Sequence, residues 1–175
     1  MALALELTLD DGADAAVREI WRGLEQVGVR SLASLLDGRV EPHVSLVVSG
    51  DVEALRALGP DLAEIVRMAG PQVLALDAIG LFPGGDPVLF LAVTPTESLL
   101  RMHADVAELL RERGVAVCPE YRPGAWVPHC TVAMAMPADC CGDAVAVIRA
   151  APLPIQARSA QLGLLDSTTG ETVFL

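Results

Sequence analysis

Hydrophobic and polar residues follow two periods along this chain, and the periods predict strands and helices in alternation. Alternation with a period of two, or a short β-branched run, is typical of strands, and a period near 3.6 is typical of helices. The expected strands are 2–9, 43–48, 73–82, 87–94, 128–135, 153–166 and 171–175. The expected helices are 10–29, 51–70, 97–114 and 138–151.

Glycine and proline divide these segments further. Gly59-Pro60 should interrupt or restart the helix over 51–70, because proline removes a backbone donor and clashes with the preceding turn. The sequences PGGD at 83–86 and STTG at 167–170 predict turns between neighbouring strands. The last two strands then form a closing hairpin.

The first long helix should bury one stripe of side chains. Ala16, Ile20, Leu24 and Val27 have the spacing of a shared face, and two acidic residues at the start favour a helix N-terminus there. The order of strand, helix, strand and helix in the first half is repeated in the second half. No low-complexity segment or long linker separates the halves, so residues 1–175 are expected to form a single α+β domain of two similar lobes.

Composition supports a folded protein with a limited range of ligands. A hydrophobic content of 53% and a mean hydropathy of +0.47 over 175 residues supply a substantial core. A net charge of -11 argues against long nucleic acid, whose phosphate backbone requires a basic surface. Any nucleotide partner should be small, or should be bound through only a short part of its length. All 12 basic residues are arginine, which excludes lysine Schiff bases, lysyl-nucleotide intermediates and the lysine-dependent phosphate loop.

The N-terminal sequence and the cysteines indicate a reducing compartment. MALALELTLDD lacks a basic segment and is apolar for too short a distance to be a signal peptide or a membrane span. We therefore expect a cytoplasmic protein that does not bind membranes. The four cysteines match no zinc ribbon and no Cys-x-x-Cys pair, so they should stay reduced, and neither a metal nor another cofactor is expected.

One short pattern occurs twice. EPHVSLVV contains His43 and Ser45, and VPHCTVAM contains His129 and Thr131, so both read Pro-His-x-[Ser/Thr] before apolar residues. With 12 Pro, 3 His and 14 Ser plus Thr, composition alone gives this pattern about once per ten thousand positions. Two copies that use two of the three histidines therefore require an explanation other than chance.

Strand geometry gives each copy a polar face and an apolar face. Residues i and i+2 of a strand point to the same side, so each histidine should project beside its hydroxyl. The intervening residues should face the core; these are Val44, Leu46 and Val48 in the first copy, and Cys130, Val132 and Met134 in the second.

Two such faces brought together would suit phosphodiester chemistry. One imidazole can remove a proton while the other donates one, and two hydroxyls can donate hydrogen bonds to the non-bridging oxygens of a phosphate. This chemistry needs no metal. A separation of roughly 5 to 8 Å between the imidazoles would span one phosphate once hydrogen-bond lengths are added on each side.

The paired motifs resemble those of the 2H phosphoesterase superfamily, which includes 2'-5' RNA ligase-like proteins and cyclic phosphodiesterases. Its hallmark is a pair of His-x-[Thr/Ser]-hydrophobic motifs, which His43 to Leu46 and His129 to Val132 match. The Phe82-Pro83 turn and the WVPH segment before the second motif are also similar. The resemblance implies a bilobal fold with two lobes related by a pseudo-twofold axis. It also implies that each lobe has an antiparallel sheet and flanking helices, with the active-site cleft between the lobes.

The resemblance also implies an activity. It implies a hydrolase acting on 2',3'-cyclic phosphate or 2'-5' phosphodiester bonds of nucleotides or short RNA ends. By resemblance His43 and His129 form the acid/base pair, and Ser45 and Thr131 hold the phosphate. Which histidine acts as the base is left open, as is the direction of the reaction. Ser45 departs from the commoner threonine, which leaves its hydroxyl less restricted at χ1.

Other polar and aromatic residues have competing interpretations. Tyr121, Arg122 and Trp126 precede the second motif, where arginine could bind phosphate and an aromatic ring could stack on a base, or where all three could simply order a loop. Phe82 could line the cleft or fill a turn. His103, within a helical pattern, is expected to be a partly exposed helix residue.

Three classes of function therefore remain. If the protein is an enzyme, the two imidazoles should face each other across an open cleft. The protein is expected to be a monomer. A non-catalytic module that binds phosphorylated nucleotides would keep the same cleft without turnover. A structural protein would place His43 and His129 far apart or seal them in the core.

Overall fold

The computed structural model describes residues 2–84 and 87–175. Their strands are β1 (Leu3–Leu9), β2 (His43–Ser49), β3 (Val73–Phe82), β4 (Val88–Thr94), β5 (His129–Met134), β6 (Ile155–Asp166) and β7 (Thr172–Phe174). Their α-helices are α1 (Asp11–Gln26), α2 (Leu32–Leu35), α3 (Val52–Ala57), α4 (Gly59–Ala69), α5 (Glu97–Glu112) and α6 (Cys141–Ala150). Two 3-10 turns, η1 (Pro119–Tyr121) and η2 (Ala138–Cys140), complete the order.

The strands form one antiparallel sheet, and its order is symmetric. The sequence of strands across the sheet is β2-β1-β6-β3-β4-β5, with β7 paired to β6. The predicted α+β class is confirmed. The division of this sheet into two lobes, and the assignment of the whole chain to a single domain, stay predictions. Reading outward from the β6–β3 pair gives β1 then β2 on one side and β4 then β5 on the other, so the two motif strands occupy equivalent edges.

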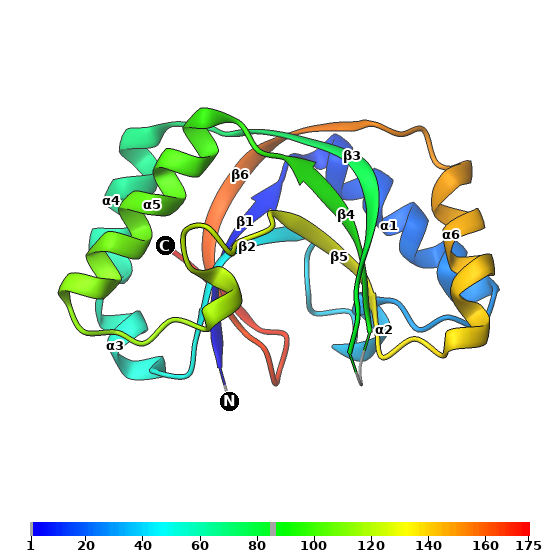
Figure 1. The fold of residues 1–175 in the computed structure, drawn as a ribbon, viewed down its shortest axis with the longest axis horizontal. Coiled ribbons are helices and arrows are strands. Elements are labelled where there is room, and N and C mark those ends of the chain that lie inside the picture. Colours follow the sequence, from blue (N-terminus) through cyan, green and yellow to red (C-terminus); the bar gives the residue numbers. More distant parts are fainter. Residues whose placement is uncertain (1, 85–86) are drawn as a thin grey trace.

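The sheet curves strongly, and its two ends approach each other. Figure 1 shows α4 and α5 beside one part of the sheet and α1 and α6 beside the other, with β2 and β5 near the middle. Residues of β2 and β5 lie in contact although these strands stand at opposite ends of the strand order. Trp126 bridges them, because its indole Nε1 donates to the backbone oxygen of Ser45 at 3.0 Å.

Helix α1 buries a slightly different face from the predicted one. Asp10 caps the helix by accepting from the backbone N–H of Ala13, and the buried face runs through Val17 and Trp21. Ile20 and Leu24 are buried as predicted and Ala16 packs partly buried against the core, but Val27 is 39% exposed, so the prediction for Val27 was wrong. Val27 is the C-terminal cap, where the backbone has left the helical conformation, so its side chain no longer follows the helical period.

The helix interruption and one of the turns that the sequence predicts are present in the structure. The interruption at Gly59-Pro60 is confirmed, since α3 ends at Ala57 and α4 begins at Gly59. The hairpin around 167–170 is confirmed by the pairing of β6 with β7. The PGGD turn includes Gly85 and Asp86, which lie outside the described residues. The short helix α2, capped by Ser31, was missed because four residues are too few to show a helical period.

Both motif strands contain a β-bulge at the same motif position. Between β1 and β2 the register shifts so that Leu46 has no partner of its own, and between β4 and β5 the extra residue is Val132. A bulge reverses the alternation beyond it. Val48 and Met134 therefore line a cavity rather than the predicted core, while Val47 and Ala133 are buried.

None of the described helices is long and apolar enough to cross a membrane.

Candidate active site

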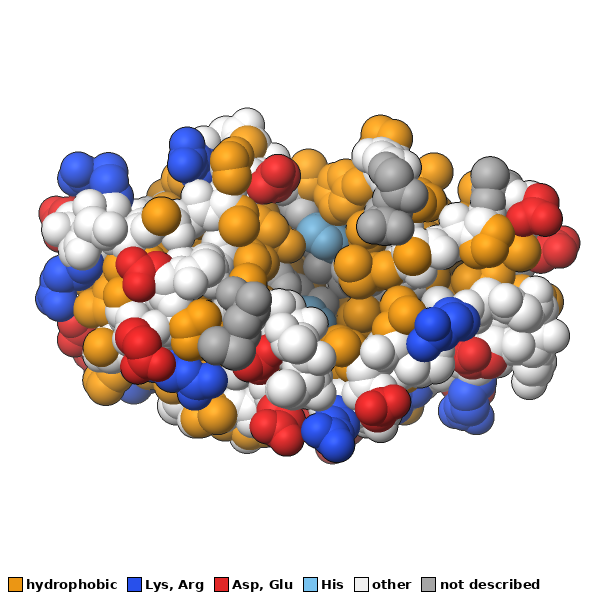
Figure 2. All heavy atoms as spheres, turned by 90° about the horizontal axis from the view of Figure 1, so that it is seen from below, with side chains coloured by type: hydrophobic (Ala, Val, Ile, Leu, Met, Phe, Trp, Pro, Cys, Tyr) orange, Lys and Arg blue, Asp and Glu red, His pale blue; other side chains and the backbone are white. Residues whose placement is uncertain are grey.

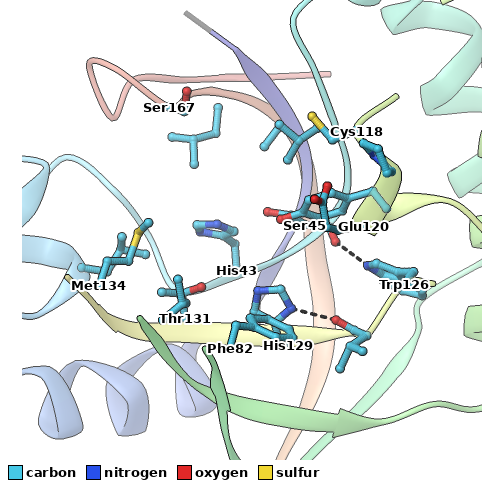
Figure 3. Close-up of a pocket in the computed structure, with 18 of the residues that line it drawn as sticks. His43, Ser45, Phe82, Cys118, Glu120, Trp126, His129, Thr131, Met134 and Ser167 are labelled. Atoms are coloured by element: carbon cyan, nitrogen blue, oxygen red, sulfur yellow. Dashed lines mark hydrogen bonds between the residues drawn. The ribbon is translucent and has the colours of Figure 1, made fainter. Parts of the chain in front are cut away.

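A cavity of about 830 Å³ opens where the two motif strands meet. His43, Ser45, His129 and Thr131 all contribute to its wall, as the sequence predicts for an enzyme or a binding module. Figure 2 shows histidine side chains in a hollow surrounded mainly by hydrophobic side chains. Figure 3 shows the rings of His43 and His129 close together, with Ser45 and Thr131 beside them. His43 is only 7% exposed, but it lines the cavity together with His129. Neither histidine is therefore sealed in the core, which disfavours the structural alternative.

The two imidazoles are held in the same way. Nδ1 of His43 donates to the backbone oxygen of Glu41 at 2.7 Å, and Nδ1 of His129 donates to that of Val127 at 2.7 Å. A carbonyl oxygen only accepts, so Nδ1 carries the hydrogen in both neutral rings. In each neutral ring Nε2 is therefore unprotonated and can accept a proton from a substrate or a water molecule. In both motifs the acceptor lies two residues before the histidine, which matches the symmetry of the sheet.

A buried carboxylate lies behind only one of the rings. Oε2 of Glu6 is 3.3 Å from Nδ1 of His43, and Oε1 of Glu6 accepts from the hydroxyl of Thr172 at 2.9 Å. The Glu6 side chain is fully buried. Burial raises the pKa of this carboxyl, and the charge of His43 opposes that rise to a smaller extent. The first motif is therefore supported by an ionisable group that it can interact with electrostatically.

Aromatic rings surround the other histidine. The ring of His129 lies 5.0 Å from the ring of Phe82 and 5.0 Å from that of Phe90, centroid to centroid. Desolvation lowers the pKa of His129, the hydrogen bond to Val127 opposes this, and the charge of His43 lowers it further. His129 is consequently held in its neutral form more strongly than an imidazole in water.

The aromatic residues before the second motif are in the cavity wall, together with Phe82. Tyr121, Trp126 and Phe82 all line the cavity. Burial raises the pKa of Tyr121, and a hydrogen bond with the Ser45 side chain opposes this. Arg122 is exposed, is absent from the wall, and donates to the backbone oxygen of Val117 at 3.4 Å. The binding roles of all four residues stay predictions.

His103 is buried, and the prediction of partial exposure was wrong. Only 2% of this residue is exposed. Its ring stacks on Trp126, with centroids 4.0 Å apart and planes 6° apart, and Nε2 donates to the backbone oxygen of Tyr121 at 3.0 Å. Desolvation lowers its pKa. His103 therefore contacts two residues of the cavity wall, Tyr121 and Trp126, in the loop before β5.

Sequence reasoning missed several residues of the site. Glu6 carries a signal in retrospect, since it is a single charge within the buried strand LALELTL. Glu120, Met134 and the leucines of α2 also line the cavity, and no local pattern marks them as neighbours of the histidines. Among residues 2–84 and 87–175, no group of three or more His, Cys, Asp or Glu residues is placed to hold a metal ion.

Comparisons with known proteins agree with the fold. A family model described as the 2'-5' RNA ligase superfamily matches residues 9–171. A structure titled phosphoesterase has a TM-score of 0.64 at 16% identity, covering 98% of this chain and 92% of that one. Protein TT0787 of Thermus thermophilus has a TM-score of 0.61 at 22% identity, covering 100% and 94%. Usb1 of Kluyveromyces marxianus, solved with uridine monophosphate, has a TM-score of 0.57 at 13% identity, covering 99% and 97%. No curated protein sequence matches the chain.

Proposed function

The chain belongs to the 2'-5' RNA ligase superfamily, and from this premise we propose that it is a metal-independent phosphoesterase acting through its two motif histidines. The proposed substrates carry a 2',3'-cyclic phosphate or a 2'-5' phosphodiester bond, on a nucleotide or a short RNA end. The uridine monophosphate named with Usb1 supports a nucleotide ligand for this fold.

One observation carries the proposal. The polypeptide brings two His-x-[Ser/Thr] faces, separated by more than eighty residues, into the wall of one cavity, with each Nδ1 bound to a backbone carbonyl. This arrangement orients both Nε2 atoms through the same contact. Two oriented imidazoles and two hydroxyls are the groups that general acid/base catalysis at a phosphodiester needs.

The proposed reaction balances without a metal or cofactor. One histidine is neutral, and its Nε2 takes a proton from water as the water oxygen bonds to phosphorus. The other starts as the imidazolium, with a hydrogen on both ring nitrogens, and its Nε2 gives a proton to the ribose oxygen that leaves. Ser45 and Thr131 donate hydrogen bonds to the non-bridging oxygens, where negative charge builds up. The product is a nucleoside monophosphate, and the reverse reaction exchanges the two proton-transfer roles.

The test is an assay with the four nucleoside 2',3'-cyclic phosphates in the presence of EDTA. We expect hydrolysis by the wild type, and we expect His43→Ala and His129→Ala each to lose at least a hundredfold in kcat, since acid/base assistance is worth about 10²–10⁴ per group. Circular dichroism and thermal unfolding of each variant serve as the folding control. Full activity in either variant would reject the paired mechanism, and a bound but unhydrolysed substrate would favour the non-catalytic module.

A further inference from the structure

The wall of the cavity is mostly apolar beyond the four motif residues. Its hydrophobic members come from every side, including Leu32, Leu36, Val48, Phe82, Met134 and Leu165. Apolar walls favour uncharged parts of a ligand, because a charged group placed there gives up its hydration without receiving a partner. We call the place beside His43, Ser45, His129 and Thr131, where the proposed substrate phosphate binds, the phosphate subsite. Its surroundings therefore do not suit a second phosphate.

The charge in the wall has the wrong sign for additional phosphates. Glu120 of η1 lines the cavity, and among the described residues the wall contains no arginine. Since the chain has no lysine, arginine is the only permanently cationic side chain available to bind a second phosphate. Glu6 is outside the wall, but its carboxyl lies 3.3 Å from Nδ1 of His43 and adds a second acidic group behind that ring.

Most of the arginines form ion pairs with acidic residues on the outer surface of the protein. Ion pairs with nearby acidic residues hold Arg18, Arg22, Arg39, Arg67, Arg101, Arg111 and Arg113. Arg122, the arginine predicted to bind substrate, instead donates to the backbone oxygen of Val117. Figure 2 shows the blue side chains on this face around the outside of the molecule, away from the histidines in the hollow.

From this wall we infer that the site accepts a phosphodiester with a single negative charge and otherwise uncharged, largely apolar or aromatic parts. Resting on the proposed function, the substrate class becomes nucleoside 2',3'-cyclic phosphates without a 5'-phosphate. The same nucleotide with a 5'-phosphate brings a further charge that Glu120 repels and no described wall residue neutralises. An RNA end, whose next phosphate occupies that 5' position, is disfavoured for the same reason.

A matched pair of substrates tests this inference. Adenosine 2',3'-cyclic phosphate and its 5'-phosphorylated form differ only in the second phosphate. At low ionic strength we expect the wild type to favour the unphosphorylated substrate by at least tenfold in kcat/KM. Glu120→Gln should narrow that ratio by about threefold or more, because it removes a wall charge and keeps the side-chain shape. Glu112→Gln makes the same charge change at the end of α5, outside the wall, and should leave the ratio as in the wild type.

The outcomes separate this inference from the proposed function. Equal kcat/KM for the two substrates would overturn the charge selectivity while leaving the phosphoesterase in place. Hydrolysis of neither substrate would overturn the proposed function and the selectivity with it. A tenfold preference that is unchanged in Glu120→Gln, or that narrows equally in Glu112→Gln, would overturn the role of Glu120.

Discussion

Glu6 and Phe90 occupy equivalent positions in the two halves of the sheet. Glu6 pairs with Ser45 of the first motif strand, and Phe90 pairs with Thr131 of the second. The hydroxyls correspond, the bulges that follow them correspond, and the strands β1 and β4 correspond in the sheet order. A buried carboxylate thus supports one histidine at the place where an aromatic ring supports the other. The two imidazoles are alike in hydrogen bonding and different in electrostatic surroundings.

Replacing Glu6 by glutamine should weaken catalysis. Glu6→Gln keeps the shape and can still accept from Thr172, but it removes the negative charge 3.3 Å from the His43 ring. A nearby carboxylate stabilises the imidazolium that proton transfer creates. We expect kcat to fall roughly tenfold, equivalent to about 1.4 kcal/mol of transition-state stabilisation, with little change in KM. Steady-state kinetics with a 2',3'-cyclic nucleotide measures this, and a raised KM at constant kcat would contradict it.

The same substitution should increase stability at neutral pH. Burial raises the folded-state pKa of Glu6 above 4.5, so its favourable contribution is complete below pH 4.5 and is lost as pH rises through the raised value. Glutamine carries no charge to bury and avoids that loss. We expect Glu6→Gln to gain about 1–3 kcal/mol in free energy of unfolding at pH 7.5 and little at pH 4.5.

Denaturant unfolding at the two pH values measures the effect on stability. Glu53→Gln, in the first turn of α3, makes the same chemical change at a surface position and serves as the control. A Glu6→Gln variant that is less stable than the wild type at pH 7.5 would show that the carboxylate is held by contacts that favour its charged form.

His129 should titrate below the usual range for histidine. Its folded-state pKa is lowered below 6.5, chiefly by desolvation, so the unfolded chain takes up a proton at this position before the folded chain does. Its contribution to stability is present above pH 6.5 and is lost as pH falls through the folded-state value. Imidazole NMR signals measure the pKa directly, with His129→Gln providing the assignment.

Opening the aromatic surroundings should reverse that shift. Phe82→Ser removes one of the rings 5.0 Å from His129 and admits water to the imidazole. We expect the pKa of His129 to move back toward 6.5, with the low-pH limb of any activity that requires neutral His129 moving up with it. An unchanged NMR titration in Phe82→Ser would show that desolvation by Phe82 is not the cause.

The motifs were predictable from sequence because their information is local. A histidine and a hydroxyl two residues apart share a strand face whatever the rest of the fold does, and the antiparallel strands around them follow from alternation and turns. The reversal of side-chain alternation at Leu46 and Val132 was not predictable, since a bulge depends on the register of the partner strand. The burial of His103 and the approach of Glu6 to His43 depend on segments distant in sequence, which one chain's periodicity does not reveal.

The two hydroxyls should contribute similarly to the reaction. Ser45→Ala and Thr131→Val each remove one donor from the cavity wall, and loss of a donor to developing negative charge is worth about 10²–10³ in kcat. Ser45→Thr is the matched control, because it retains the hydroxyl and adds a β-branch that restricts χ1; we expect kcat within about threefold of the wild type. Unaltered kcat in Ser45→Ala would assign Ser45 to its hydrogen bond with Tyr121 instead.

His103 should act on substrate binding through the ring that it supports. Because His103 stacks on Trp126 and donates to the backbone of Tyr121, His103→Ala removes the packing behind two residues of the cavity wall. We expect KM for a 2',3'-cyclic nucleotide to rise roughly tenfold while kcat changes little, since the proposed catalytic groups on β2 and β5 keep their own hydrogen bonds. His103→Phe preserves a stacking ring and should recover most of the loss in KM. Val106→Ala, at a buried position one turn further along α5, controls for general loosening of the core. A rise in KM as large in Val106→Ala as in His103→Ala would mean that overall stability, and not the stack on Trp126, determines the shape of the cavity.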